Sequence, residues 1–211
     1  MIADKAWQDG LRSAAIIYPN AGWGTRYFDG FRERWESLGG YIAGSISYDQ
    51  NEKDFSALMK SLMQNGGDFV FIVAKPVTAR QIRQQVGSLG SAGTPVYAAS
   101  TAYDRRLYGV KDRDFNNVKI PVLRWTVPGQ SVPGVPDWES FKATGNFDPA
   151  LAKFYALGID ALLVAINNEA LSDGGSVTGA TGDLRVSVNG IIQPVMLWLY
   201  YQDGIPVPLY Y

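Results

Sequence analysis

The 211-residue sequence contains no histidine and no cysteine. Without histidine, the commonest general base and the commonest zinc ligand are both missing. Without cysteine, there is no thiol nucleophile, no ligand for an iron–sulfur cluster and no disulfide. A serine nucleophile would need a lysine partner, and neither G-x-S-x-G nor S-x-x-K occurs. We therefore expect a protein that binds and does not catalyse, with no catalytic residues, no metal and no cofactor.

The sequence also lacks long apolar runs and an excess of charge of either sign. No run approaches the roughly 20 apolar residues that a membrane-spanning helix needs. Lysine plus arginine number 19 and aspartate plus glutamate 20, so a nucleic-acid partner is not expected. The segment Met1–Lys5 has no basic start followed by an apolar core, so no signal peptide is expected. An apolar fraction of 46% is typical of a globular protein.

Apolar runs alternate with helical patterns in the first part of the chain. Such alternation predicts βαβ units and a parallel sheet, which right-handed crossovers make doubly wound. The fold class is therefore α/β. The predicted strands are 13–18, 41–47, 69–74, 95–99 and 118–123, and the predicted helices are 2–9, 24–38, a helix capped by Asp54, and 77–89.

The pattern changes after residue 124. Residues 127–136 hold three prolines and two glycines, which is typical of a linker or crossover. We therefore predict three parts: a parallel α/β lobe at 1–124, a crossover at 125–147, and returning helices with an antiparallel hairpin tail at 148–211.

The third part combines a helical pattern with a hairpin signal. Helices are predicted over 148–171, with a break at Gly158, and the glycine-rich residues 174–182 predict a loop. Asn189-Gly190 predicts a two-residue hairpin turn between strands at 184–188 and 191–201. The helical segment carries a broad apolar stripe: Phe154, Leu157, Ala161, Leu162, Ala165 and Ile166.

Candidate binding residues follow from the predicted sheet, because ligand clefts lie beyond the carboxyl ends of parallel strands. Aromatic residues in loops add to this expectation, since tyrosine and tryptophan are enriched at binding surfaces. The mixed charges at 104–114 are expected to form a solvated face. The loop aromatics are Trp23, Tyr103, Tyr108, Trp125 and Trp138, and the candidate cleft residues are Asn20, Trp23, Lys75, Ser100, Tyr103 and Trp125.

Several segments resemble the LppC-type lipoprotein family. AAIIYPNAGWGTRYFDGFRERWESLGG has that family's apolar strand, proline, Trp-Gly pair, and helix with F-x-x-x-W ending in Leu-Gly-Gly. DFVFIVAKPVTARQIRQQV resembles its next strand and helix. PVYAAS, FYALGIDALLV and GATGDLRVSVNGIIQPVMLWLYYQDGIPVPL follow in the family's order, so the likeness runs from about residue 3 to residue 209.

The resemblance implies a type I periplasmic-binding-protein fold with two lobes joined by crossover strands. This chain resembles the second lobe plus the returning C-terminal part. The best-known branch of the family comprises outer-membrane lipoproteins that activate a class A penicillin-binding protein by protein–protein contact, with no catalytic residues to carry over. The implied location is the periplasm, with an N-terminal lipid anchor that this chain does not contain.

Two functions follow from these observations. The leading hypothesis is a non-enzymatic regulator of peptidoglycan synthesis whose partner is a class A penicillin-binding protein. The alternative is one lobe of a periplasmic solute-binding protein, with amino acids or cell-wall fragments as the small ligand in an interlobe cleft. The apolar stripe of residues 148–171 further predicts that these helices either fold back on their own sheet or form a homodimer with a second copy.

Overall fold

The computed structural model describes residues 1–89, 93–105, 112–145, 148 and 151–209. The chain divides into two compact units. The first unit comprises Met1–Pro121 and Leu199–Val207, and the second comprises Val122–Trp198 and Pro208–Tyr211. The long strand β8 (Ile192–Gln202) contributes residues to both.

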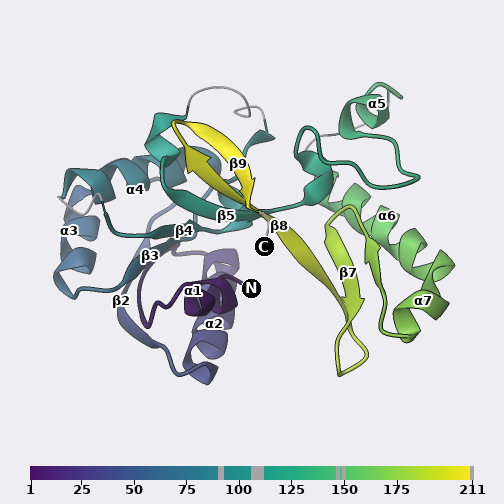
Figure 1. The fold of residues 1–211 in the computed structure, drawn as a ribbon. Coiled ribbons are helices and arrows are strands. Elements are labelled where there is room, and N and C mark those ends of the chain that lie inside the picture. The colour runs from purple at the N-terminus through teal and green to yellow at the C-terminus, as the bar shows by residue number, and fades with distance from the viewer. Residues whose placement is uncertain (90–92, 106–111, 146–147, 149–150, 210–211) are drawn as a thin grey trace. The chain divides into compact units, whose positions relative to one another are not determined.

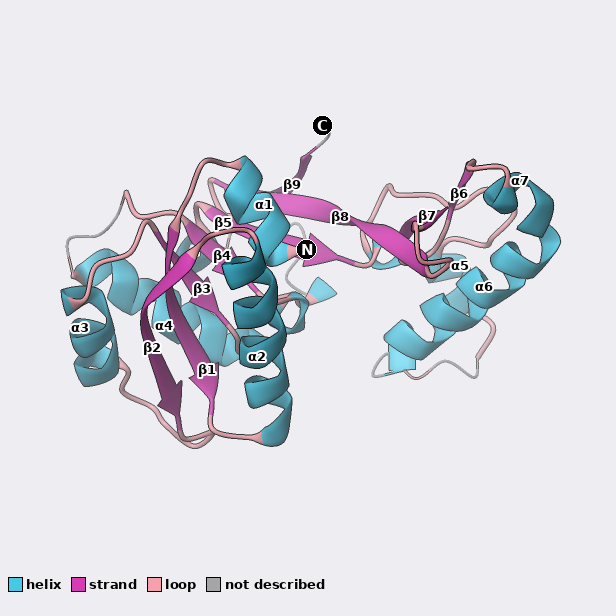
Figure 2. Ribbon diagram, turned by 90° about the horizontal axis from the view of Figure 1, so that it is seen from below, coloured by secondary structure: helices cyan, strands magenta, loops and turns pink. Residues whose placement is uncertain are grey.

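The first unit is a parallel sheet between two layers of helices (Figures 1 and 2). Its strands lie in the order β2-β1-β3-β4-β5, and β8 follows β5 and pairs with β9. All four pairings from β2 to β5 are parallel, which confirms the predicted α/β class and doubly wound order. The elements are α1 (Ile2–Gln8), β1 (Ser13–Pro19), α2 (Gly22–Ser37), β2 (Tyr41–Tyr48), α3 (Ser56–Gln64), β3 (Phe69–Ile72), α4 (Pro76–Ser88), β4 (Val96–Ala98), η1 (Ser100–Ala102), η3 (Arg113–Phe115), β5 (Val118–Val122) and β9 (Ile205–Leu209).

An aromatic cluster between α2 and the sheet forms much of the first unit's core. The rings of Phe31 and Trp35 stack with centroids 5.7 Å apart, and Trp35 meets Phe69 edge-on at 5.4 Å. The Trp35 indole donates a hydrogen bond to the Tyr41 carbonyl at 2.9 Å. A Cβ on Gly40 would lie 2.3 Å from the same indole, so glycine is required there. The F-x-x-x-W and Leu-Gly-Gly motifs are therefore parts of one packing arrangement.

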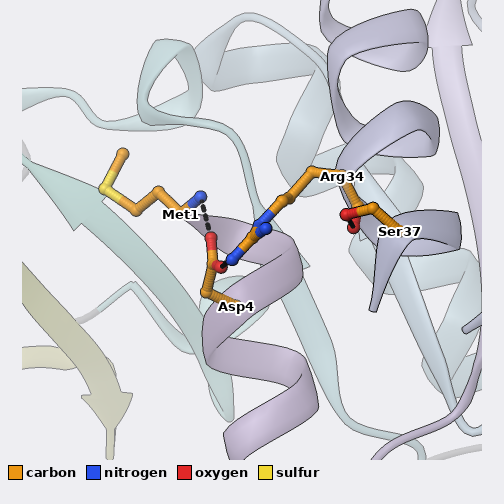
Figure 3. Close-up of polar contacts among 4 residues, drawn as sticks. All are labelled: Met1, Asp4, Arg34 and Ser37. Atoms are coloured by element: carbon orange, nitrogen blue, oxygen red, sulfur yellow. Dashed lines mark hydrogen bonds and ion pairs between the residues drawn. The ribbon is translucent and has the colours of Figure 1, made fainter. Parts of the chain in front are cut away.

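Helix α1 is joined to α2 by an exposed ion pair (Figure 3). The Arg34 guanidinium donates to Asp4 Oδ1 from Nε at 2.7 Å and from Nη2 at 2.5 Å. The Met1 amino group lies 2.6 Å from the other oxygen of the same carboxylate. Burial acts to raise the pKa of Asp4, but these hydrogen bonds outweigh it and leave the pKa below its usual value. Because the pair is solvated, we expect it to fix the angle of α1 more than to add stability.

The second unit is an antiparallel sheet with helices, as predicted for the tail. Strand β6 pairs with β7, and β7 pairs with β8, both antiparallel. Trp125 and Trp138 lie in its core with the inner face of α6. Its remaining elements are η4 (Arg124–Thr126), α5 (Trp138–Lys142), α6 (Ala152–Ile166), α7 (Asn168–Ser172), β6 (Ser176–Thr178) and β7 (Gly182–Val186).

The structure corrects several sequence predictions. Helix α6 continues through Gly158 and ends before Asn167, so the predicted break was wrong. The residues expected to form a loop at 174–182 include strand β6. Residues 125–147 contain the short helix α5, which was not predicted. Asp54 is not the N-cap of α3, although its carboxylate accepts the backbone N–H of Ser56 at 2.9 Å. The error at Gly158 concerns the interior of a 15-residue helix, whereas the others concern a short element or a helix boundary.

A buried carboxylate fixes α6 to the loop that precedes β7. Asp160 accepts hydrogen bonds from the backbone N–H of Ala180 at 2.5 Å and of Thr181 at 3.1 Å. It also accepts one from the Thr181 hydroxyl. A Cβ on Gly179 would lie 2.6 Å from the Asp160 carboxylate, which explains one glycine of this glycine-rich segment. The segment thus has a structural role that its composition did not reveal.

Candidate interaction site

The carboxyl ends of β1, β3 and β4 lie at one edge of the first unit's sheet. Ile17 is in register with Ile72, and Ile72 with Ala98, so the three strands end at the same level. Hydrogen bonds from Val73 to Ile17 at 2.9 Å and from Ala99 to Ile72 at 2.8 Å continue the ladder past the strand ends. The loops that leave these strands therefore start side by side, which is where parallel α/β folds place binding residues.

The loop from β1 to α2 presents a pair of aromatic side chains. Trp23 and Tyr27 lie one helical turn apart, with ring centroids 6.2 Å apart at 90°. A Cβ on Gly24 would lie 2.2 Å from the Pro19 carbonyl oxygen, so the first turn of α2 rests directly on the end of β1. This close approach explains the Trp-Gly pair: the glycine allows the contact, and the half-buried Trp23 is held beside it.

Hydroxyl groups from η1 extend this surface toward β3 and α2. The Tyr27 hydroxyl lies 3.5 Å from Ser100 Oγ. Thr101 donates from Oγ1 to the Ala74 carbonyl at 2.8 Å, which joins η1 to the end of β3. Lys75 follows directly, is exposed, and is the last residue before α4 begins at Pro76. The residues at this edge thus include aromatic rings, hydroxyls and one ammonium group.

Arg80 joins the end of η1 to Asp112, the residue before η3. Its Nη1 donates to the carbonyls of Pro76 at 2.7 Å and Ala102 at 3.2 Å, and its Nε donates to Asp112 at 2.8 Å. Its guanidinium also lies 4.4 Å from the centroid of the Phe115 ring. Asp112 is therefore a buried ion-pair partner, and the prediction that the charges at 104–114 form a solvated face was wrong for this residue. Tyr103 directly follows Ala102, whose carbonyl accepts a hydrogen bond from Arg80, and is half-buried.

A buried tyrosine packs against Phe115, the ring that contacts the Arg80 guanidinium. Tyr201 from β8 meets Phe115 edge-on with ring centroids 5.2 Å apart. Burial raises the pKa of Tyr201 to about 12, so its hydroxyl stays neutral at physiological pH. The segment that carries Arg113 and Phe115 is thus supported by the C-terminal hairpin, which fixes the partner of Arg80.

Five of the six candidate residues lie at this carboxyl edge: Asn20, Trp23, Lys75, Ser100 and Tyr103. Trp125 does not, because it belongs to the second unit and is 2% exposed. Its indole donates to the Pro136 carbonyl at 2.9 Å, and its ring meets Trp138 and Phe141 edge-on. Trp125 and Trp138, predicted among the loop aromatics of a binding surface, are therefore buried core residues, and that prediction was wrong for them. Tyr108 lies outside the described residues.

Sequence reasoning missed two residues of this edge. Tyr27 could have been found from its spacing of four residues after Trp23, which places both rings on one face of a helix. Thr101 follows Ser100 directly, at the end of a strand. We define the carboxyl-edge site as these two residues with Asn20, Trp23, Lys75, Ser100 and Tyr103.

The side chains of the carboxyl-edge site can bind by apolar contact, hydrogen bonding and one positive charge. Within the described residues, no group of three or more acidic, histidine or cysteine side chains could hold a metal ion. The same described part of the chain contains no helix that is long and apolar enough to cross a membrane.

A doubly wound parallel sheet is thus followed in this chain by an antiparallel sheet with helices. A family model described as periplasmic binding protein matches residues 2–180. The chain belongs to the periplasmic binding protein family.

The predicted resemblance to LppC-type lipoproteins is confirmed by relatives of known name. The penicillin-binding protein activator LpoA of Histophilus somni is 27% identical over 98% of this chain, which spans 35% of that relative. The C-domain of LpoA from Haemophilus influenzae, described as a regulator of PBP1A, superimposes with a TM-score of 0.77 at 23% identity over 99% of this chain and 65% of that one. A leucine-binding protein from Thermotoga maritima has a TM-score of 0.67 at 17% identity, over 99% of this chain and 63% of its own, and shows the shared fold.

Proposed function

We propose that this chain is a regulator of peptidoglycan synthesis that acts by binding a class A penicillin-binding protein and has no reaction of its own. The observation that carries the proposal is the match over 98% of the chain to a relative named as a penicillin-binding protein activator. The H. influenzae C-domain, described as a regulator of PBP1A, supports the same class of partner. The chain spans about a third of the length of this relative, so its part in the activity of the whole protein is a proposal.

We further propose that residues 1–124 act as the second lobe of a two-lobed domain, 125–147 as its crossover and 148–211 as its returning part. In this proposal the protein is periplasmic and tethered to the outer membrane by a lipid. The lobe presents the carboxyl-edge site to its partner. Half-buried aromatic side chains such as Trp23 and Tyr27 are typical of the core of an interface, and an exposed lysine such as Lys75 is typical of its polar rim.

The test is binding of the purified chain to a purified class A penicillin-binding protein, measured by surface plasmon resonance. Trp23→Ala and Lys75→Glu should each weaken binding, because they remove an aromatic contact and reverse the charge of the site. Matched controls are Tyr41→Ala, an exposed aromatic on β2, and Lys60→Glu, an exposed lysine on α3. Equal binding by all four variants would move the contact surface away from the carboxyl edge.

A second candidate function is a ligand-binding lobe for amino acids or cell-wall fragments. The specific observation in its favour is the cluster of hydroxyls of Tyr27, Ser100 and Thr101 at the edge where parallel folds bind small molecules. A thermal-shift screen with free amino acids and muropeptides distinguishes the two, since a specific ligand raises the melting temperature. A shift with one ligand and no capture of a penicillin-binding protein would favour this second function.

A further inference from the structure

Arg80 is a buried cation that connects three segments of the first unit. Its side chain is 11% exposed, and that of Asp112, its ion-pair partner, is 8% exposed. Nε and Nη2 donate to Asp112 Oδ2 at 2.8 and 2.5 Å, while Nη1 donates to the carbonyls of Pro76 in α4 and Ala102 in η1. A guanidinium stays at this depth only while its charge is compensated. The hydrogen bond to Ala102 therefore depends on the position of Asp112.

The position of Asp112 is set by the turn of the C-terminal hairpin, residues 199–207. The strands β8 and β9 are joined by Asp203 and Gly204, whose φ values of 52° and 77° are both positive, as a tight two-residue hairpin turn requires. The Asp112 N–H donates to the Gly204 carbonyl at 2.7 Å, and the Gly204 N–H donates to Asn116 Oδ1 at 2.6 Å. Both polar groups of Gly204 are thus bonded to residues that flank η3.

The strands of the hairpin hold the far end of the same segment. The Asn117 N–H donates to the Tyr201 carbonyl at 2.9 Å, and the Tyr200 hydroxyl donates to Asn117 Oδ1 at 2.5 Å. Phe115 is fully buried and contacts both the Arg80 guanidinium and the Tyr201 ring. Residues 112–117 are therefore bonded to α4 and to the hairpin along their whole length.

The carboxyl-edge site shares η1 with this network. Ser100 is the first residue of η1, and Tyr103 directly follows its last residue, Ala102. Thr101 ties the middle of η1 to the end of β3, whereas the hydrogen bond from Arg80 holds the end that leads to Tyr103. That end of η1 is therefore anchored in Arg80 and, through it, in the hairpin.

We propose that the C-terminal hairpin and the carboxyl-edge site are coupled through Arg80. Arg80 is a positioning residue: the ordered hairpin holds Asp112, Asp112 holds the guanidinium, and the guanidinium holds η1 in the conformation that presents Tyr103. Such coupling is reciprocal, so a molecule bound at the carboxyl edge stabilises the hairpin by the factor by which the ordered hairpin strengthens its binding. The coupling within the chain is independent of the proposed function, whereas its effect on partner affinity rests on that function.

The experiment is hydrogen exchange of backbone N–H groups, followed by NMR in the whole 211-residue chain. Gly204→Val places a β-branched residue at a positive φ and should open the hairpin turn. The Ala102 N–H should then exchange at least about tenfold faster, while the Val73 N–H at the end of β3 keeps its wild-type rate. Gly190→Val is the matched control, because Gly190 has a φ of 72° in the turn between β7 and β8 of the second unit. It should leave Ala102 unchanged.

Asp112→Asn breaks the ion pair and leaves the hairpin turn intact. It should accelerate exchange at Ala102 to a similar degree, because a neutral amide does not compensate the guanidinium. The Asn117 N–H, which bonds to the hairpin, should stay protected. This variant decides the question alone if Gly204→Val does not fold. A wild-type exchange rate at Ala102 in Asp112→Asn would overturn the proposal, as would an equal rise at Ala102 and Val73.

Surface plasmon resonance against a class A penicillin-binding protein measures the effect on binding. Gly204→Val should weaken binding at least about fivefold, and Gly190→Val should not. If the wild-type chain does not bind, the proposed function fails and the exchange rates alone decide the coupling. If the wild-type chain binds and Gly204→Val accelerates exchange at Ala102 without weakening binding, the coupling of the hairpin to the binding site is wrong.

Discussion

The two units differ in how completely they cover their own apolar surface. Strand β3 of the first unit is buried at all four positions, between helices that cover both faces of its sheet. Among the described residues, six large apolar side chains are exposed in the first unit and nine in the second, although the second unit is shorter. The first unit therefore buries both faces of its sheet, whereas the second unit buries one face of α6, its longest helix. Mutations in the two units should therefore change the free energy of unfolding by different amounts.

The largest effect is expected in the core of the first unit. Trp35→Ala should lower the free energy of unfolding by about 4 kcal/mol, because it empties a fully buried site bounded by Phe31 and Phe69. Urea denaturation followed by circular dichroism measures the change. Trp23→Ala, which truncates a half-buried tryptophan, is the control and should cost much less. Equal losses would mean that the aromatic cluster does not dominate this core.

The matching change in the second unit is Asp160→Ala. It should lower the free energy of unfolding by about 3 kcal/mol, because it leaves the backbone N–H groups of Ala180 and Thr181 buried without an acceptor. Calorimetry should assign the loss to the transition of the second unit. Asp173→Ala, at an exposed position beyond α7, should have little effect. A loss spread equally over both units would contradict their separation.

The first unit should also depend on pH through Asp9. Burial acts to raise the pKa of Asp9, but hydrogen bonds from Lys119, Lys5 and Tyr97 outweigh it and hold the pKa below the usual 3.8. Because the folded pKa is depressed, this stabilisation is present above the unfolded value and is lost as the pH falls through the folded value. Asp9→Asn should remove about 1 kcal/mol at neutral pH, after discount for partial exposure, and flatten the decline in stability below about pH 4. An unchanged acid limb in Asp9→Asn would exclude this network as its cause.

The smallest effect is expected at the exposed pair that joins α1 to α2 (Figure 3). Arg34→Met keeps the aliphatic stem and removes the charge that binds Asp4. The free energy of unfolding should change by less than about 1 kcal/mol, because exposed pairs gain little over solvated charges. Thermal denaturation at low and high salt checks this. A larger loss would show that α1 depends on this pair and not on its buried alanines.

Much of the fold could be predicted because local pattern and tertiary packing agree in the first unit. Continuous apolar runs such as residues 69–72 can be buried only between two layers of helices, and they were assigned correctly. The wrong predictions lie where the local sequence pattern and the tertiary packing disagree. Gly158 suggested a break, yet α6 continues because its inner face is held by the cluster around Trp125. Strand β6 was missed because its three residues gain strand geometry by pairing with β7.

The candidate site shows the same division. The carboxyl ends of parallel strands lie at the same edge of a sheet, so residues that follow these ends could be placed there from the sequence. The residues placed correctly are Asn20, Trp23, Lys75, Ser100 and Tyr103. The rule does not apply to Trp125, because the chain leaves the parallel sheet after β5 and that side chain packs in another core. Position in a loop gives no information on burial. Contacts of Trp125 with Trp138 and Phe141 could not be read from the sequence.

The most direct test of the regulator proposal is the affinity of the purified chain for a purified class A penicillin-binding protein, measured by surface plasmon resonance with Trp23→Ala alongside. We predict saturable binding by the wild-type chain, weakened in Trp23→Ala and unchanged in Tyr41→Ala. The absence of saturable binding, together with a melting temperature raised by an amino acid or a muropeptide, would contradict the regulator function and establish the first unit as a ligand-binding lobe.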